Sequence, residues 1–387
     1  MPGYFLSLNS RKATHITFYN WRDILNPYAG GAEKYVYEMA WRLVRDGYHV
    51  TWISSRANDQ PKRATFKGIN IIRIGNIFTV FFLSLFTSRK IHDNETVVDS
   101  VNAIPFFDNP FAKKVVLIHH FVPFQVLKDK LGYLAPVAFF FQNVFNPIFY
   151  RSKKVLTVSN STRNDLISYG YKVPKVVKLG TDGFDNSLER KEKIIVAPGP
   201  LRPWKNHDQI IEAFSAVPVD YKLVIFGKPE TLKYELYLKQ LVSDFGLSDR
   251  VSFLGEITEE AKNEVYRESR LAVFATDKEG WGLSCIEAQG FSCPVVAYDV
   301  PGIRDSVRQN ETGLLVKYLD IKSLSNAMLK LIGDDSLYQK LSIGAYKWAR
   351  SMDWDACYTD FVDKMDLVEK QIEIAPKDYL SASLIFK

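Results

Sequence analysis

Several features that mark other protein classes are scarce or missing in this sequence. Only three of the 387 residues are cysteines, Cys285, Cys293 and Cys357, and their spacing indicates neither a disulfide framework nor a metal site. The longest apolar stretch, residues 134–150, is too interrupted by polar residues and proline to span a membrane. The first residues lack the charged start and apolar core of a signal peptide. These absences favour a cytoplasmic protein with reduced thiols.

The charge distribution argues against a nucleic-acid-binding protein. The formal net charge is +6, and the basic residues are too dispersed to form a stripe that would bind nucleic acid. A modest basic excess is compatible with an anionic substrate or an anionic membrane surface. The glycine-rich turns do not match the G-x-G-x-x-G fingerprint, so an oxidoreductase of the usual dinucleotide-binding kind is not supported.

The stretch from Asp277 to Pro294, which reads DKEGWGLSCIEAQGFSCP, organises the chain. It lies between two β-type runs, residues 271–275 and 295–298, and reads as a loop that opens into a helix near Gly282. This is the pattern of a strand–loop–helix–strand unit in a parallel sheet.

The chemistry of this unit follows from its geometry. A helix start presents unpaired N–H groups and a partial charge of about +0.5, which suit an anion. Gly280 and Gly282 allow a ligand to approach the backbone, and we expect Glu279 in the loop and Glu287 about a turn along the helix. Carboxylates accept hydrogen bonds from hydroxyls. The implied ligand has an anionic middle and polyol ends, as a nucleotide-diphosphate sugar has. Taken singly, either glutamate would more often be a solvated charge at a helix end, and only the whole string with its glycines and flanking strands favours a binding role.

Three other turns carry candidate ligand groups. Gly30 and Gly31 lie between the apolar run 15–21 and a helical pattern that ends at Gly47. A second turn, after residues 194–197, contains Gly199, Arg202 and Lys205. The third candidate is the pair His119 and His120, at the end of a short strand and thus at the carboxyl edge of a sheet, where open α/β sheets bind ligands. Each turn is also compatible with a purely structural role.

The strings EGWGLSCIEA, PVVAYDVPGIRDSV and ETGLLV resemble the signature of the retaining glycosyltransferases of family 4, which carries two glutamates separated by seven residues, as Glu279 and Glu287 are. The resemblance implies that Glu279 contacts donor-sugar hydroxyls and that Glu287 binds the ribose. The backbone of Gly280, Trp281, Gly282 and Leu283 would hold the diphosphate and sugar.

The same resemblance assigns roles to the other turns. A Gly-Gly-x-Glu loop at Gly30 and Gly31 faces the donor diphosphate, and a histidine near the donor sugar matches His119 or His120, which the sequence does not distinguish. Lys205 matches a lysine of the family's diphosphate site. Pro200 stands where many members have arginine, so we expect Arg202 to serve instead, held in an extended conformation by the proline that follows it.

The implied fold is GT-B, in which two doubly wound Rossmann-like α/β domains face a cleft. We expect an acceptor-side domain over residues 1–183, with 184–193 as a linker, and a nucleotide-sugar domain over residues 184–353. A last helix, about 354–370, would cross back onto the first domain. Strands are expected in the first half at 15–21, 49–54, 70–74, 96–101, 115–119, 154–158 and 176–179, and in the second at 194–197, 222–226, 251–254, 271–275, 295–298 and 313–316.

The function that follows is transfer of a sugar, a hexose by analogy, from a donor such as UDP-glucose or GDP-mannose to a glycan or lipid-linked acceptor. No cofactor is expected beyond the nucleotide sugar. We recognise no Asp-x-Asp metal motif and expect the helix end, Lys205 and Arg202 to hold the diphosphate without metal. Two rivals stay open, a sugar-nucleotide epimerase on the same architecture and a non-catalytic binding subunit.

Two aromatic segments, residues 77–86 and 135–150, leave another alternative open. They either pack inside the first domain or touch a membrane surface, as apolar faces beside basic residues can. The flanking basic residues are Arg89, Lys90, Arg151, Lys153 and Lys154. On the second alternative, the protein would be peripheral at the cytoplasmic face of a membrane.

Overall fold

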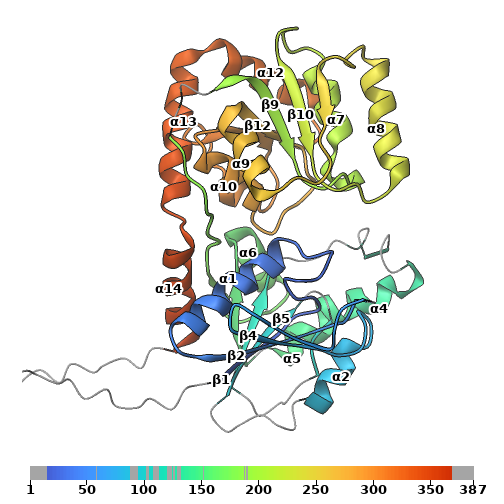
Figure 1. Cartoon of the computed structure of the whole chain (residues 1–387), viewed down its shortest axis with the longest axis vertical. Coiled ribbons are helices and arrows are strands. Elements are labelled where there is room, and N and C mark those ends of the chain that lie inside the picture. The colour runs from blue at the N-terminus through green and yellow to red at the C-terminus, as the bar shows by residue number, and fades with distance from the viewer. Residues whose placement is uncertain are drawn as a thin grey trace, which may run out of the picture.

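The structure is a computed structural model, which describes residues 15–57, 59–87, 95–101, 104–107, 113–119, 124, 127–128, 132–150, 152–186, 188 and 191–367. The candidate site residue His120 and the basic residues Arg89, Lys90 and Arg151 lie outside these ranges. The chain forms two sheets, one in each half, with helices packed around them (Figure 1). Within the described ranges, no helix has both the length and the apolar character needed to cross a bilayer.

The first sheet has eight strands in the order β3-β4-β2-β1-β5-β6-β7-β8. They are β1 His15–Tyr19, β2 His49–Ser54, β3 Arg63–Phe66, β4 Ile69–Arg73, β5 Thr96–Val101, β6 Lys113–Ile118, β7 Lys154–Thr157 and β8 Lys175–Val176. Strands β1, β2 and β5 are buried almost throughout, as parallel strands covered on both faces must be.

Strand β3 is the element of this sheet that the sequence analysis missed. It pairs with β4 in antiparallel fashion through a two-residue turn at Lys67 and Gly68, both with positive φ, 49° and 79°. A two-residue turn with positive φ at both positions matches the twist of a hairpin. The Lys-Gly pair is the sequence feature from which this hairpin turn could have been predicted.

The helices of the first half lie between these strands. They are α1 Gly31–Arg45, α2 Val80–Thr87, η2 Gly132–Leu134, α4 Ala135–Phe140, η3 Phe141–Phe145, α5 Asn146–Phe149 and α6 Asn160–Ser168. Helix α6 begins at Ser159, whose hydroxyl caps it by accepting from the N–H of Thr162 at 3.0 Å. Serine is a preferred N-cap residue, so the start of this helix has a local signal in the sequence.

The second sheet has six strands, all parallel, in the order β11-β10-β9-β12-β13-β14. They are β9 Glu192–Pro198, β10 Lys222–Phe226, β11 Val251–Phe253, β12 Ser269–Phe274, β13 Val295–Tyr298 and β14 Gly313–Val316. The helices are η5 Pro203–Lys205, α7 His207–Phe214, α8 Leu232–Asp244, α9 Glu259–Glu268, α10 Leu283–Gly290, α11 Ile303–Ser306, α12 Ile321–Gly333, α13 Asp335–Arg350 and α14 Trp354–Met365. The six predicted strands of this half are confirmed.

In both sheets, the order in which the chain adds strands reverses near the middle of the sheet. From β9 the chain moves outward to β10 and β11 and then returns to place β12 on the other side of β9. The first sheet does the same around β1, with β2 and β4 on one side and β5 on the other. Ligands of open α/β sheets bind beyond the carboxyl ends of the strands at such a switch point. In the second half, that place is formed by the loops after β9 and β12.

The last helix packs against the first half of the chain. Trp354 and Phe361 of α14 are buried in one apolar cluster with Tyr35 and Met39 of α1, and α14 lies beside α1 in Figure 1. The N–H of Thr181 donates to the carbonyl of Met352 at 2.8 Å where the chain crosses back. The division at residues 183 and 184 stays a prediction.

Candidate functional site

The helix expected near Gly282 is α10, and the loop before it is tightly packed, both at Gly282 itself and against Gly302, the N-cap of α11. Gly282 is its N-cap, with φ of 92°, and a Cβ there would lie 2.6 Å from the hydroxyl of Ser306. A Cβ on Gly302 would lie 2.2 Å from the carbonyl oxygen of Glu279, whose N–H donates to Pro301 at 3.0 Å. Glu279 therefore sits on a rigid turn, as the chemistry of a binding loop requires.

The first turn of α10 offers backbone donors. Among the described residues, none accepts a hydrogen bond from the N–H groups of Gly282, Leu283 or Ser284. Such groups and the helix dipole together favour an anion. The side chain of Trp281 is buried with core residues of the first half, and Leu283 packs against the same cluster. Gly280 lies in the loop between Glu279 and Trp281.

Lys205 and Glu279 form an ion pair across the two central loops of the second half. Lys205 ends the short helix η5 after β9, and Glu279 lies in the loop after β12. The loops are tied together by the amide of Asn206, which donates to the carbonyl of Ala275 at 2.8 Å and to the carboxylate of Asp277 at 2.6 Å. The structure thus brings two predicted site residues together at the switch point of the sheet.

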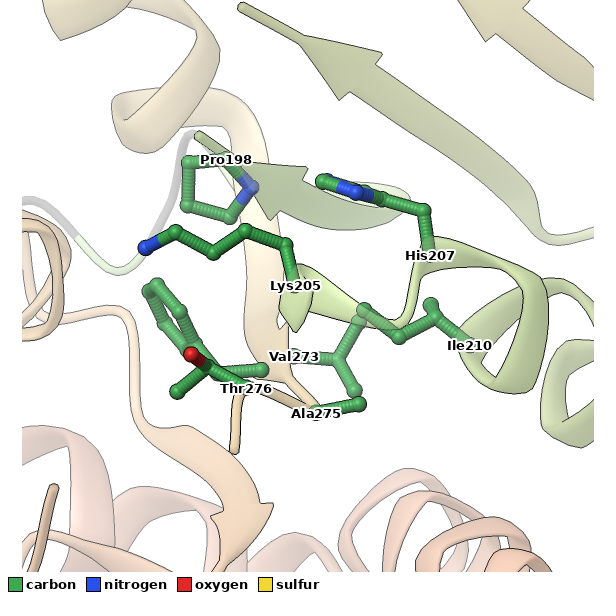
Figure 2. A pocket seen from close by; sticks show the side chains of 8 residues that line it. Pro198, Lys205, His207, Ile210, Val273, Ala275 and Thr276 are labelled. Atoms are coloured by element: carbon green, nitrogen blue, oxygen red, sulfur yellow. The ribbon is translucent and has the colours of Figure 1, made fainter. Parts of the chain in front are cut away.

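Lys205 also lines a small pocket with His207 (Figure 2). The other lining residues are Pro198, Ile210, Val273, Phe274, Ala275 and Thr276. Burial, and secondarily the charge of Lys205, lowers the pKa of His207 to about 3. The imidazole is therefore neutral at physiological pH, and Lys205 carries the positive charge of this pocket.

Glu287 lies on α10 between two lysines that the sequence analysis did not single out. Its Oε1 atom is 3.0 Å from the Nζ of Lys262 on α9 and 3.8 Å from the Nζ of Lys34 on α1. Burial alone would lower the pKa of Lys262, but Glu287 and Glu259 outweigh it and raise that pKa. Glu287 is thus a buried carboxylate held by cations from both halves of the chain.

The turn at Gly30 and Gly31 starts α1 and faces α10. The N–H of Gly30 donates to Oε2 of Glu33 at 2.7 Å, and burial raises the pKa of that carboxyl group. A Cβ built on Gly31 would lie 3.8 Å from Leu283. The starts of α1 and α10 therefore meet across the two halves, which agrees with the facing loops expected from the sequence.

Gly199 and Arg202 follow strand β9. Gly199 has φ of 125°, and a Cβ there would lie 3.8 Å from the Nζ of Lys205. Arg202 is extended, with φ of −131° and ψ of 144°, as the proline after it predicts. Its Nε lies 3.6 Å from Oε1 of Glu230, and its guanidinium lies 5.7 Å from the centre of the Trp204 ring. The structure pairs Arg202 with Glu230 and Lys205 with Glu279.

His119 directly follows β6 and is buried. Its ring meets the ring of Tyr35 on α1 edge-on, with centroids 5.5 Å apart, and its carbonyl accepts from the hydroxyl of Thr162 at 3.4 Å. His119 is therefore anchored beneath α1 and α6 at the carboxyl edge of the first sheet.

One Asp-x-Asp string was overlooked in the sequence, Asp353-Trp354-Asp355. Asp353 caps α14 by accepting from the N–H of Ala356 at 2.7 Å, and Asp355 pairs with Arg42 and Arg45 of α1. Both carboxylates thus have structural roles. No group of three or more potential metal-ligating side chains is found in the part of the chain that the structure describes.

Comparisons with known sequences match both halves of the chain. Residues 29–182 match the family described as glycosyltransferase family 4, and residues 181–348 match glycosyl transferases group 1. An exopolysaccharide phosphotransferase of Streptomyces coelicolor is 31% identical over 207 residues, and a D-inositol 3-phosphate glycosyltransferase of Salinispora tropica is 30% identical over 185 residues. The matches cover 51% and 46% of this chain but only 22% and 38% of those two proteins.

Solved structures resemble the whole described fold. The sucrose-phosphate synthase of Thermosynechococcus elongatus superposes with a TM-score of 0.75 at 18% identity, over 92% of this chain and 98% of that one. The Anabaena protein HepE, solved in complex with UDP-glucose, superposes with a TM-score of 0.70 at 16% identity, over 92% of this chain and 100% of that one. These likenesses show the two-domain GT-B fold.

Proposed function

Because the chain belongs to the retaining glycosyltransferases of group 1 and family 4, we propose that it transfers a sugar from a nucleotide-diphosphate sugar to an acceptor, with retention at the anomeric carbon. The observation that carries the proposal is the ion pair of Lys205 and Glu279 beside the first turn of α10. It places a cation, a carboxylate and free backbone donors together at the switch point of the second sheet.

The proposed donor site has three parts. The diphosphate binds the first turn of α10 and Lys205, since both favour anions. A bound diphosphate competes with Glu279 for the ammonium group of Lys205. Glu279 is then free to accept hydrogen bonds from sugar hydroxyls. Glu287 accepts from the ribose hydroxyls, and Lys262 fixes its orientation.

The remaining site residues complete the proposal. The Gly30–Gly31 turn and the Gly199 backbone border the diphosphate, with Arg202 as a second cation. The family resemblance supports a role for one histidine of the pair His119 and His120 at the donor sugar. In this arrangement the protein positions the reactants and stabilises the charge of the leaving diphosphate. We therefore expect most of the rate enhancement to come from preorganised charge.

We propose a hexose donor such as UDP-glucose or GDP-mannose. The fold-level similarity to a protein solved with UDP-glucose supports the first of these. For the acceptor we propose a glycan or lipid-linked molecule bound on the first half of the chain. We further propose a cytoplasmic location, because all three cysteines are buried free thiols. The aromatic segments 77–86 and 135–150 are the reason to propose peripheral contact with the cytoplasmic face of a membrane as well.

The experiment that tests the proposal is a thermal-shift screen against UDP, GDP and their sugar conjugates, followed by assay of released nucleotide with and without candidate acceptors. Stabilisation by one nucleotide series and acceptor-dependent release support a transferase. Conversion of the nucleotide sugar into its epimer without any acceptor, and without net release of nucleotide, would indicate an epimerase. Binding without turnover of any nucleotide sugar, with or without acceptors, would indicate a non-catalytic subunit.

A further inference from the structure

The run of helices from η2 to α5 is built with its apolar side outward. Five large apolar residues spaced three or four apart are exposed, from 46% at Val144 to 91% at Tyr133. These residues are Tyr133, Val137, Phe140, Val144 and Ile148. The buried positions of the same run are instead small, polar or proline, namely Ala135, Ala138, Gln142, Asn146 and Pro147. A surface helix of a water-exposed protein has the opposite pattern.

Helix α2 continues the same surface. It buries Val80, Phe81 and Ser84 and exposes Phe82, just as the preceding turn exposes Phe78. Phe82 stacks on Phe107, with ring centroids 5.3 Å apart, and Phe107 contacts the rings of Phe141 and Phe145 of η3 at 6.4 and 6.3 Å. The two helical segments therefore share one surface, which we call the aromatic face. It consists of Phe78, Phe82, Tyr133, Val137, Phe140, Val144 and Ile148.

The aromatic face lies on the far side of the first half from α14, where α2 and α4 are seen in Figure 1. An exposed apolar surface of this extent on a folded protein marks a binding surface. It does not belong to the donor site, whose residues lie in the second half and at the starts of α1 and α10. It therefore indicates a partner other than the nucleotide.

Charge identifies the kind of partner. Neither helical segment, residues 76–87 or residues 132–150, contains a charged residue. The longer acid-free segments around them, residues 60–92 and 131–164, carry basic residues and no aspartate or glutamate. Two of these basic residues have other partners, since Arg73 is buried against Asp23 and Lys154 pairs with Asp366.

Among the described residues, the cations of the first segment that stay exposed are Lys62, Arg63 and Lys67. An uncharged apolar surface whose neighbouring segment exposes only positive charge matches the interface of an anionic bilayer.

A second copy of the chain fits this surface less well. A two-fold interface brings the same segment of both copies together, so the basic flanks would face each other without acidic partners. A bilayer with anionic headgroups has no such conflict. Since no described helix is suited to cross a membrane, the contact would be peripheral.

We propose that the chain docks on an anionic bilayer through the aromatic face. This inference deepens the membrane location proposed above and names the surface responsible. Docking places the first half, on which the acceptor is proposed to bind, against the lipid. The contact needs no nucleotide, so it is tested independently of the donor chemistry.

The test is flotation of the full chain with vesicles of phosphatidylcholine alone or mixed with phosphatidylglycerol. The wild type is expected to float with the anionic vesicles and to be released by salt. The double variant Val137→Glu with Ile148→Glu should bind at least about tenfold more weakly, because two apolar anchors are lost and two like charges are added. The matched control is Leu232→Glu with Leu236→Glu, two exposed leucines of α8 in the second half, and it should float like the wild type.

Thermal melting and nucleotide binding serve to show that both double variants are folded. The proposal is overturned if the wild type binds neither vesicle, or if the α8 control loses binding as fully as the aromatic-face variant. It is also overturned if light scattering shows a dimer that Val137→Glu with Ile148→Glu dissociates while the wild type ignores vesicles, since the face would then join two copies of the chain.

Discussion

Lys205 and Arg202 lie three residues apart in the turn after β9, yet they have different partners. Lys205 pairs with Glu279 inside the candidate site, while Arg202 lies 3.6 Å from Glu230 on the side of β10 and α8. Both are cations that a diphosphate could engage, and a lysine acts as a point charge where an arginine can bind two oxygens. The contribution of each cation to turnover can therefore be separated by kinetic measurements on single variants.

We predict that Lys205→Ala and Arg202→Ala each reduce kcat, by about tenfold or more, because a charge-assisted hydrogen bond contributes about 1.5–3 kcal/mol. Arg202→Lys should recover only part of the loss, since it keeps the charge without the bidentate geometry. Steady-state kinetics with circular dichroism as a folding control measures this. Normal turnover by Arg202→Ala beside an inactive Lys205→Ala would show that Lys205 works alone.

His207 makes stability depend on pH. Its pKa is lowered from 6.5 to about 3 in the folded chain, so only the unfolded chain takes up a proton between these values. The stabilising effect is complete above pH 6.5 and is lost progressively as the pH falls toward 3. From pH 6.5 to 5.5 the wild type should lose about 1 kcal/mol more unfolding free energy than His207→Gln. Urea denaturation at the two pH values measures the difference, and equal losses would contradict the assignment.

Among single residues, those whose position depends on neighbours in the sequence could be predicted. Glu279 in its loop and Glu287 on the helix were placed correctly, because the glycines and flanking strands define that unit. Lys262 and Lys34 were missed, since their contacts with Glu287 span 25 and 253 positions of the chain. No local pattern distinguishes them from other lysines of a helix.

Helix α6 is the element that joins the two halves beside the site. Asp305 of α11 accepts from the N–H of Asn160 at 2.9 Å and of Ser161 at 3.3 Å, and Lys278 lies 2.7 Å from Asp165. Lys278 precedes Glu279, and Gly302, the N-cap of α11, packs on Glu279. The first half thus contacts the second on both sides of the catalytic candidate.

We predict that Asp305→Ala lowers kcat/KM about fivefold while nucleotide affinity stays within about twofold, because a lost helix cap is worth about 1 kcal/mol. The matched control is Asp299→Ala, an exposed carboxylate of the same half that pairs with Arg304. Full kinetics and nucleotide titration of both variants measure this. An equal effect of the two substitutions would contradict a role for the α6 contact in positioning Glu279.

Most elements were predictable because their signals are local. The strands of both parallel sheets appear as short apolar runs between polar turns, and Ser159 marks the start of α6. Strand β3 was missed because none of its four residues is fully buried, so it forms no apolar run, and because its turn is a Lys-Gly pair. The aromatic segment 135–150 stood out in the sequence, but which of its sides is buried depends on tertiary packing and could not be predicted.

At the scale of the whole molecule, two GT-B halves meet at the starts of α1 and α10. Gly31 approaches Leu283, and Lys34 reaches Glu287. Resemblance to a family predicted this facing arrangement, whereas composition and periodicity alone predicted only two α/β halves. The domain boundaries at 183 and 184 are still predictions, because α14 and the turn at Thr181 connect both halves.

We predict that transfer does not require a divalent metal, because the helix start and Lys205 already supply positive charge at the proposed diphosphate site. Activity in excess EDTA should remain within about twofold of activity with magnesium, since neither cation source depends on the metal. Assay of released nucleotide under both conditions measures this. Strict dependence on magnesium or manganese would show that the diphosphate is held in another way.

The central claim is that Glu287 holds the ribose and Lys205 the diphosphate of one bound nucleotide. Calorimetric titration of a nucleoside diphosphate and the matching monophosphate into the wild type, Glu287→Ala, Lys205→Ala and the exposed control Glu260→Ala tests it most directly. Glu287→Ala should weaken both nucleotides equally, by about 1.5–3 kcal/mol, and Lys205→Ala should weaken the diphosphate more than the monophosphate. Glu260→Ala should bind like the wild type. Unchanged affinities in both site variants, or binding of neither UDP nor GDP by the wild type, would contradict the account.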